Sequence, residues 1–369
     1  MRVSVIGLCG DELAAFNAEP SWGLIEVMAA VGSVVDFAQH RARLFFGKAE
    51  LTEDTTLADI GAAEGSQLTL VKSFALRIAS ASHDGIAKLW SATSGECLGT
   101  LAGHEGRVMG VALSPDGRLV ATSSCDGTAR VWSTATGECL RVLRCHDGVV
   151  FSAAFSPEGH ELLTASGDCT ARVHRTASFE LVRTLKGHRS VVFSAVFSPD
   201  GQQVLSASFD RTAKLWDMAT GSCVRTLEGH ASQVYAASFA PDGRRAATAG
   251  ADGTVRVWDL ARGECERMLA GQSKAAFSAV FSPDGMQVLA ASDGGTVGLW
   301  DAATGERLRQ VEGHARSVRS AAFTPDGLGF VTTGSDGALR LWNTATGEHL
   351  RAFIGHCGTV AWAACTRTG

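Results

Sequence analysis

Residues 187–217 read GHRSVVFSAVFSPDGQQVLSASFDRTAKLWD, and this stretch decides the fold. It holds three short apolar runs, separated by the turn residues 198–201 (SPDG) and by a turn at Asp210. Pro fixes φ at the first position of a turn, and Gly accepts a positive φ at the closing position. A fourth run, 223–227, follows a turn that ends in Gly221. Four short strands with a turn between each pair predict a small antiparallel sheet.

The same pattern returns every 42 residues. Seven dipeptides mark its register, and six of them end in His: Gly103-His104, Cys145-His146, Gly187-His188, Gly229-His230, Gly271-Gln272, Gly313-His314 and Gly355-His356. A fixed period of about 40 to 45 residues indicates an array of identical units, none of which buries its own faces alone. Seven such sheets arranged radially form a β-propeller. We number the units repeat 1 to repeat 7, and repeats 2 to 7 begin at the first six dipeptides.

Repeat 1 is divided between the two ends of the array. Residues 75–101 supply its second, third and fourth strands but no His-led first strand. Residues 355–369 supply a His and one apolar run, 360–365. We therefore expect the C-terminal strand to complete repeat 1, because this pairing removes two open sheet edges. The run 68–71 lies in the same phase and is the alternative first strand.

The third run of most repeats ends in Trp, followed by Asp at 216–217, 258–259 and 300–301. With the repeated Gly-His, residues 74–369 resemble the WD-repeat family. The resemblance implies an all-β, seven-bladed β-propeller of 42-residue repeats. It also implies a buried tetrad in each blade that joins His, a second-strand Ser or Thr, the turn Asp and Trp. The matching residues are His356, Ser80, Asp84 and Trp90 in repeat 1; His104, Thr122, Asp126 and Trp132 in repeat 2; His188, Ser206, Asp210 and Trp216 in repeat 4; His230, Thr248, Asp252 and Trp258 in repeat 5; and His314, Thr332, Asp336 and Trp342 in repeat 7.

Two repeats depart from this pattern. In repeat 6, Gln272, Ala290 and Gly294 stand at the His, Ser/Thr and Asp positions. Repeat 3 has His174 in place of Trp, and Phe179 where the other repeats carry Gly, so that a left-handed turn is strained or changes type. We expect repeats 3 and 6 to be the least stable. The six histidines of the repeated dipeptides lie in six different repeats and are too widely spaced to form a metal site, and no metal, cofactor or catalytic residue is expected.

The fifth residue after the His varies between repeats, so it is free for recognition. In the WD-repeat family this residue lies near the mouth of the central channel on the top face, beside the residue that precedes the turn Asp. The resemblance therefore implies a partner-binding rim of Met109, Phe151, Phe193, Phe209, Tyr235, Phe277 and Arg319. Aromatic rings suit a peptide anchor or an Arg side chain held between them. The alternative is that these rings pack between the inner strands as core.

Residues 1–73 show none of the period. They carry 5 basic and 10 acidic residues, whereas residues 74–369 carry 28 of each, so the net charge of −5 belongs to the N-terminal region. Residues 1–5 alternate like a strand, and Leu24, Val27, Met28 and Val31 follow the helical period after Ser21, a candidate cap. The runs 43–48 (RLFFGK) and 67–71 (QLTLV) resemble ubiquitin-like domains. The resemblance implies a small α+β domain of the β-grasp type, followed at residue 74 by the propeller.

The apolar recognition patch of that family maps onto Leu8, Phe45 and Val71, with Thr69 beside them. We expect the patch to bind a partner such as a ubiquitin receptor. The alternative is that Phe45 and Val71 are buried where the domain meets the propeller. No Gly-Gly pair follows Val71, so conjugation to substrates is not expected.

The remaining features favour binding over chemistry. Four of the ten cysteines occupy one repeat position in separate sheets, and there is no Cys-x-x-Cys, signal peptide or long apolar span, which indicates a cytoplasmic or nuclear setting. There is no phosphate-binding Gly loop or nucleophile elbow, and the neutral propeller disfavours nucleic acid.

The sequence therefore predicts a non-catalytic scaffold or adaptor that binds a protein or peptide and recruits ubiquitin-pathway machinery. Expected partners are ubiquitin receptors, the proteasome or ligase subunits, and no binding to nucleic acid or membrane is expected. One alternative is a substrate receptor of a ubiquitin ligase. Against it, Ala261 stands where receptors of one ligase class carry Arg after Trp-Asp-x. The other alternative is an assembly scaffold without a ubiquitin link.

Overall fold

The computed structural model describes residues 2–6, 12–24, 26–27, 30, 40–46, 49–51, 55–63, 65–269 and 274–368. The chain forms two compact units: Met1–Ala75 with Thr368–Gly369, and Leu76–Arg367. Within the described residues, none of the helical segments has the length and apolar character required to span a membrane. The two units are described separately below.

The first unit is built on a mixed sheet. Its strands are β1 (Arg2–Ile6), β2 (Glu12–Asn17), β3 (His40–Phe46), β4 (Ala49–Leu51) and the beginning of β5 (Gln67–Ser82), in the order β2-β1-β5-β3-β4. β1 and β5 are parallel, and the other neighbours are antiparallel. Alternate strand residues point to one face, which buries Val3, Val5, Leu44 and Leu68 with Leu57 from the following turns.

A helical segment packs on this core, and its start corrects the expected cap. Leu24 is the first helical residue described, and Val27 and Ala30 continue the helix. The carbonyl of Gly23 accepts a hydrogen bond from the Val27 amide at 3.2 Å, and the Gly23 amide donates to Glu26 Oε2 at 3.0 Å. Gly23 is therefore the N-cap, with Glu26 satisfying its amide, and the assignment of Ser21 as the cap was wrong.

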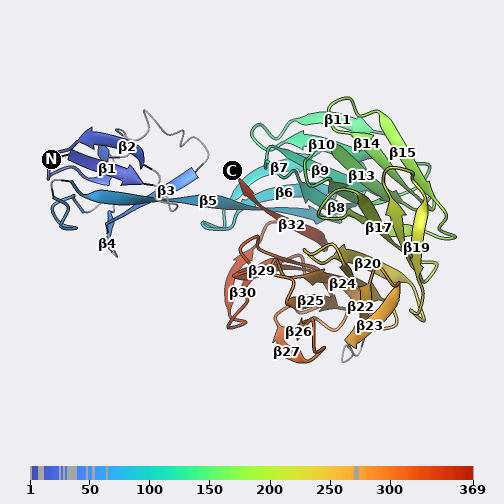
Figure 1. Ribbon diagram of the computed structural model, residues 1–369. Coiled ribbons are helices and arrows are strands. Elements are labelled where there is room, and N and C mark those ends of the chain that lie inside the picture. Colours follow the sequence, from blue (N-terminus) through green and yellow to red (C-terminus); the bar gives the residue numbers. More distant parts are fainter. Residues whose placement is uncertain are drawn as a thin grey trace. The chain divides into compact units, whose positions relative to one another are not determined.

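The second unit consists of repeated four-stranded antiparallel sheets (Figure 1). Repeats 2 to 4 form β8 (Val108–Leu113), β9 (Leu119–Ser124), β10 (Ala129–Ser133), β11 (Cys139–Leu143); β12 (Val150–Phe155), β13 (Glu161–Ser166), β14 (Thr170–Arg175), β15 (Leu181–Lys186); and β16 (Val192–Phe197), β17 (Gln203–Ser208), β18 (Ala213–Asp217), β19 (Cys223–Leu227). Repeats 5 to 7 form β20 (Val234–Phe239), β21 (Arg245–Gly250), β22 (Val255–Asp259), β23 (Glu264–Leu269); β24 (Ala276–Phe281), β25 (Gln287–Ser292), β26 (Thr296–Asp301), β27 (Arg307–Glu312); and β28 (Val318–Phe323), β29 (Gly329–Gly334), β30 (Leu339–Asn343), β31 (His349–Phe353).

Burial follows the order of the strands within each sheet. The second strands, such as β17, are almost wholly buried, whereas the fourth strands, such as β19, are mostly exposed. Among the described residues, seven hydrophobic clusters each join two consecutive repeats, and one of them joins repeat 7 to repeat 1 through Val331, Leu339, Ile78 and Trp90. The unit is therefore packed as a closed series of sheets of the β-propeller type.

The C-terminal strand completes repeat 1, as expected. β32 (Val360–Thr368) pairs with β5, which pairs in turn with β6 (Ile86–Ser91), and β6 pairs with β7 (Cys97–Ala102). The alternative first strand, residues 68–71, pairs instead with β1 and β3 of the first unit.

Candidate functional site

The predicted rim residues stand at one structural position in the first strand of their sheets. In β8, the pairing with β9 passes from Val108 to Gly110 and skips Met109. The same irregularity skips Phe151, Phe193, Tyr235, Phe277 and Arg319 in the corresponding strands. Each is thus the extra residue of a β-bulge, which bends the strand and redirects that side chain.

These redirected side chains surround one cavity. Its wall also includes His83, Ser152, and Ala361 and Trp362 of β32, beside the six redirected residues Met109, Phe151, Phe193, Tyr235, Phe277 and Arg319. The cavity has a volume of about 190 Å³ and is lined from the first strands of all seven repeats. All six of the predicted lining residues are half-buried, so they are neither fully buried core nor freely exposed rim.

The rings form a continuous chain along one wall. The centroid of Phe193 lies 5.0 Å from Phe151 and 5.5 Å from Tyr235, and Tyr235 lies 5.2 Å from Phe277. Phe209 does not line the cavity itself, but it stacks on Phe193 at 5.4 Å and meets Tyr235 edge-on at 5.6 Å. Aromatic pairs at these separations are attractive beyond the area they bury, so the wall is held in one arrangement.

The opposite side of the cavity is cationic. The Arg319 guanidinium lies 4.7 Å above the Phe277 ring, and its Nε donates to Ser335 Oγ at 3.0 Å. Burial lowers the pKa of His83, and the nearby Arg107 and Arg319 lower it further. His83 is therefore neutral at pH 7, and the arginines carry the positive charge of this side.

The five complete tetrads lie within hydrogen-bond distance in the structure. In repeat 2, the Trp132 indole donates to Thr122 Oγ1 at 2.8 Å, and His104 joins Thr122 at 2.7 Å and Asp126 at 2.8 Å. The corresponding distances in repeats 1, 4, 5 and 7 are 2.7 to 3.0 Å. One proton arrangement satisfies the chain: Trp donates to the hydroxyl, the hydroxyl to His Nε2, and His Nδ1–H to the carboxylate.

The pKa shifts in repeat 2 agree with a neutral imidazole beside an ionised carboxylate. Burial lowers the pKa of His104, although Asp126 opposes this shift. Burial alone would raise the pKa of Asp126, but hydrogen bonds from Thr128 and His104 outweigh it and lower the pKa to about 2. The tetrads are therefore structural units, each satisfied within its own sheet. Among the described residues, no group of three His, Cys, Asp or Glu side chains is placed to hold a metal ion.

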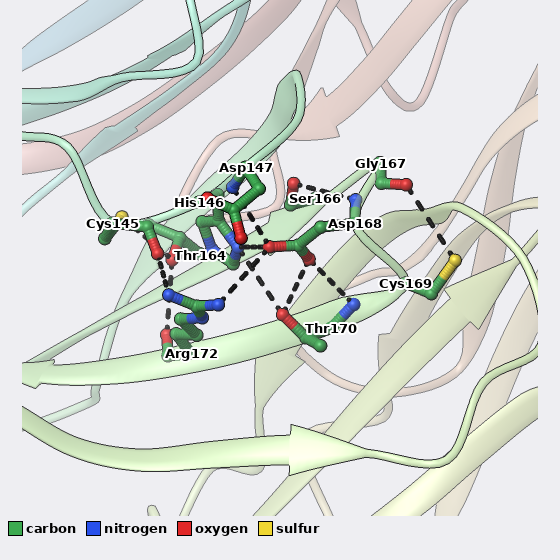
Figure 2. A network of polar contacts seen from close by, with 10 residues as sticks. All are labelled: Cys145, His146, Asp147, Thr164, Ser166, Gly167, Asp168, Cys169, Thr170 and Arg172. Carbon is green, nitrogen blue, oxygen red and sulfur yellow. Dashed lines mark hydrogen bonds and ion pairs between the residues drawn. The ribbon is translucent and has the colours of Figure 1, made fainter.

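Repeat 3 keeps part of this network and replaces the rest (Figure 2). His146 still bonds Asp168 and Thr164, each at 2.8 Å. Arg172, beneath them in Figure 2, donates to the Cys145 carbonyl and approaches Asp168 at 3.5 Å. At the Trp position, His174 is buried, and its Nδ1 has no hydrogen-bond partner among the described residues.

Cys145 and His174 replace a Gly–Trp pair. In repeats 2 and 4, a Cβ on the Gly before the His would lie 3.3 and 3.2 Å from the Cη2 edge of Trp132 and Trp216, so the indole leaves little room for a side chain there. Repeat 3 has the smaller imidazole and, with it, the larger Cys145. Sequence reasoning noticed His174 but missed this pairing, although both changes occur in the same repeat.

Phe179 takes the strained conformation that its position predicted, with φ of 60°. Its ring packs against the cluster between repeats 2 and 3 and lies 5.2 Å beneath the Arg141 guanidinium. In repeat 6, Ala290 has no hydroxyl and Gly294 no carboxylate, and Ser292 Oγ instead meets Thr296 Oγ1 at 2.9 Å. Gln272 lies outside the described residues.

The predicted patch of the first unit is described only in part. The backbone of Phe45 pairs with Thr69, and Arg43 pairs with Val71, which places these positions on the neighbouring strands β3 and β5. Leu8 lies outside the described residues.

A family model described as "WD domain, G-beta repeat" matches six segments of the chain, which cover more than half of it: residues 95–133, 137–175, 179–217, 221–259, 263–301 and 305–343. No curated protein matches the chain.

Proposed function

Because the chain belongs to the WD-repeat family, whose repeats generally mediate protein–protein interaction, we propose that it is a non-catalytic scaffold whose central cavity holds a protein or peptide partner. The observation that carries the proposal is the unbroken chain of ring contacts from Phe151 to Phe277, which ends under Arg319 at the cavity wall.

The ring behind this cavity is a closed propeller of seven blades. Hydrophobic clusters between all consecutive repeats support this, together with the pairing of β32 with β5. Closure fixes each bulge in place, so the partner meets a preorganised surface and less conformational entropy is lost on binding.

The size of the cavity sets what enters it. A dry cavity of about 150 Å³ accommodates a benzene ring. The central cavity, at about 190 Å³, therefore accepts one large apolar side chain, or an Arg stacked between rings, from an otherwise surface-bound segment. Buried anchors of this kind supply most of the binding energy in many interfaces.

The first unit is a ubiquitin-like domain that recruits ubiquitin-pathway machinery through the patch around Phe45, Thr69 and Val71. The strand order β2-β1-β5-β3-β4, with parallel β1 and β5, supports this part of the proposal. The protein works in the cytoplasm or nucleus, and the free state of every cysteine among the described residues supports a reducing compartment.

Affinity capture tests the binding face. A Phe193→Ala, Tyr235→Ala variant removes two aromatic rings of the cavity wall. As a control, a Leu140→Ala, Leu350→Ala variant removes two apolar side chains of outer strands that are 52% and 53% exposed. We expect the cavity variant to lose its partners and the outer-strand variant to keep them. Thermal unfolding curves are measured to verify that both variants are folded. Equal capture by the two variants would reject the cavity as the binding site.

The identity of the captured proteins distinguishes the three functions. A ubiquitin receptor or proteasome subunit favours the proposal, and a ligase core favours a ligase substrate receptor. The capture of neither kind of protein favours a scaffold without a ubiquitin link.

A further inference from the structure

A second, polar cavity adjoins the central one. It has a volume of about 540 Å³ and lies among the loops of repeats 6 and 7 and the C-terminal segment. Lys274, Asp293, Arg316 and Ser335 contribute to its wall, and Arg319 lines both this cavity and the central one. The two cavities therefore share one lining residue, Arg319.

The cations of this cavity are peculiar to these two repeats. Lys274 and Arg316 are the second residues after the dipeptide's last position, where the other five repeats carry only small residues: Gly106, Gly148, Ser190, Ser232 and Gly358. Arg319 stands where the other repeats carry Met, Phe, Tyr or Ala. The shared framework does not require these charges, because the remaining repeats fold without them.

The positive charge at this cavity is not neutralised by its surroundings. Asp293 is the only carboxylate among the described lining residues, and Ser317 Oγ donates to it. Neither Lys274 nor Arg316 forms an ion pair with another described residue, and both are exposed. The guanidinium of Arg319 stacks on the Phe277 ring, and its Nε donates to Ser335. These contacts leave the terminal Nη groups available to a ligand.

We propose that this cavity binds an anionic group, a carboxylate or a phosphate, carried by the same peptide whose apolar side chain occupies the central cavity. The inference rests on the proposed function and names the chemistry of the partner. A guanidinium fixed by stacking presents its two Nη groups in the geometry that carboxylate and phosphate oxygens match, and Lys274 and Arg316 add charge around it. Because Arg319 faces both cavities, the anionic residue and the apolar anchor are close neighbours in the partner's sequence.

Titration of the full-length protein with inorganic phosphate, and separately with acetate, tests the site at low ionic strength, where charge interactions are least screened. The readout is the NMR signal of the Arg319 Nε–H group. We expect a saturable shift, and we expect the anion affinity obtained from it to fall about tenfold or more in a Lys274→Ala, Arg316→Ala variant, because two of the three cations that line the cavity are removed. Arg189→Ala, which removes an exposed cation from an equivalent loop of repeat 4, is the matched control and leaves binding unchanged.

Saturation by both anions shows that a carboxylate is sufficient, and saturation by phosphate alone assigns the ligand to a phosphorylated residue. No saturation by either anion, or equal binding by the wild type and the double variant, overturns the inference. Partner capture that still depends on Phe193 and Tyr235 would then leave the proposed function standing, so the two failures are distinguishable.

Discussion

Nδ1 of His356 lies 2.9 Å from Oδ2 of Asp84, although the two residues are 272 positions apart in the chain. The amide of the next residue, Cys357, donates to the same carboxylate at 3.0 Å. Nε2 of His356 meets Ser80 Oγ, which also accepts the indole N–H of Trp90. The tetrad of repeat 1 is therefore assembled from both ends of the array. The four other complete tetrads, in repeats 2, 4, 5 and 7, obtain the same bonds locally, whereas this one forms only when the ring has closed.

Restoring the Gly–Trp pair should stabilise repeat 3. In a His174→Trp, Cys145→Gly variant, the indole can donate to Thr164 Oγ1 as its counterparts do, and the unpartnered Nδ1 of His174 is removed. We expect a gain of about 1 to 2 kcal/mol in the free energy of unfolding by urea. His174→Trp alone should destabilise, because the larger ring meets the Cys145 side chain. A coupling energy near zero in this double-mutant cycle would contradict the account.

Stability should fall steadily as the solution is acidified below pH 6.5. Burial lowers the pKa of His174 from 6.5 to about 4, with a further contribution from His146, so the unfolded state binds its proton first. The stabilisation from neutral His174 is therefore present above pH 6.5 and lost between pH 6.5 and 4, by about 1 to 3 kcal/mol.

The tetrad carboxylates add a second step at lower pH. The pKa values of Asp126 and Asp336 fall from 3.8 to about 2, because hydrogen bonds outweigh the effect of burial. Their stabilisation is lost as the pH falls from about 4 to 2. Urea midpoints measured from pH 7.5 to 2 check both steps. The His174→Trp, Cys145→Gly variant should show a shallower decline between pH 6.5 and 4, and an identical slope would refute the role of His174.

Repeats 3 and 6 should open before their neighbours. Repeat 3 lacks the indole bond, and in repeat 6 Ala290 offers Trp300 no hydroxyl. Hydrogen exchange should therefore release the amides of β13 and β25 sooner than those of β17 and β21, which belong to complete tetrads. Uniform protection of all four strands would show that partial tetrads do not lower local stability.

The four-strand repeat could be predicted because its apolar runs and turn residues recur within 42 residues of local sequence. The tetrads were implied by the resemblance to the WD-repeat family. The closing strand was predictable as well, since it carries the His and the apolar run that residues 75–101 lack, although residues 68–71 lie in the same phase and were the alternative. The sequence also showed that the fifth position after the His varies between repeats, and the resemblance to the WD-repeat family implied that this position lies at the central channel. Phe209, which was grouped with these residues, stacks on Phe193 and does not line the cavity.

What escaped prediction depends on contacts between distant segments. The bulges at Phe193 and its counterparts are visible only in the pairing register, and the composition of these strands does not predict them. The paired replacement of Gly and Trp by Cys145 and His174 could be predicted only with the knowledge that these two positions, 29 residues apart in the chain, are in contact. The sequence already showed a local basic character at Lys274, Arg316 and Arg319 and left an acidic or phosphorylated ligand open, but the cavity that these residues line together is visible only in the structure.

The reactivity of Cys365 tests ring closure most directly. Cys365 lies on β32 and packs against the cluster between repeats 7 and 1, where burial raises the pKa of its thiol to about 12. Cys357, in the loop before this strand, is exposed. Because the thiolate is the reactive form, alkylation of the native protein at pH 8, followed by mass spectrometry, should label Cys357 rapidly and leave Cys365 unmodified until the protein is unfolded. Labelling of Cys365 at the rate of Cys357 would show that the C-terminal strand is free and that the ring is open.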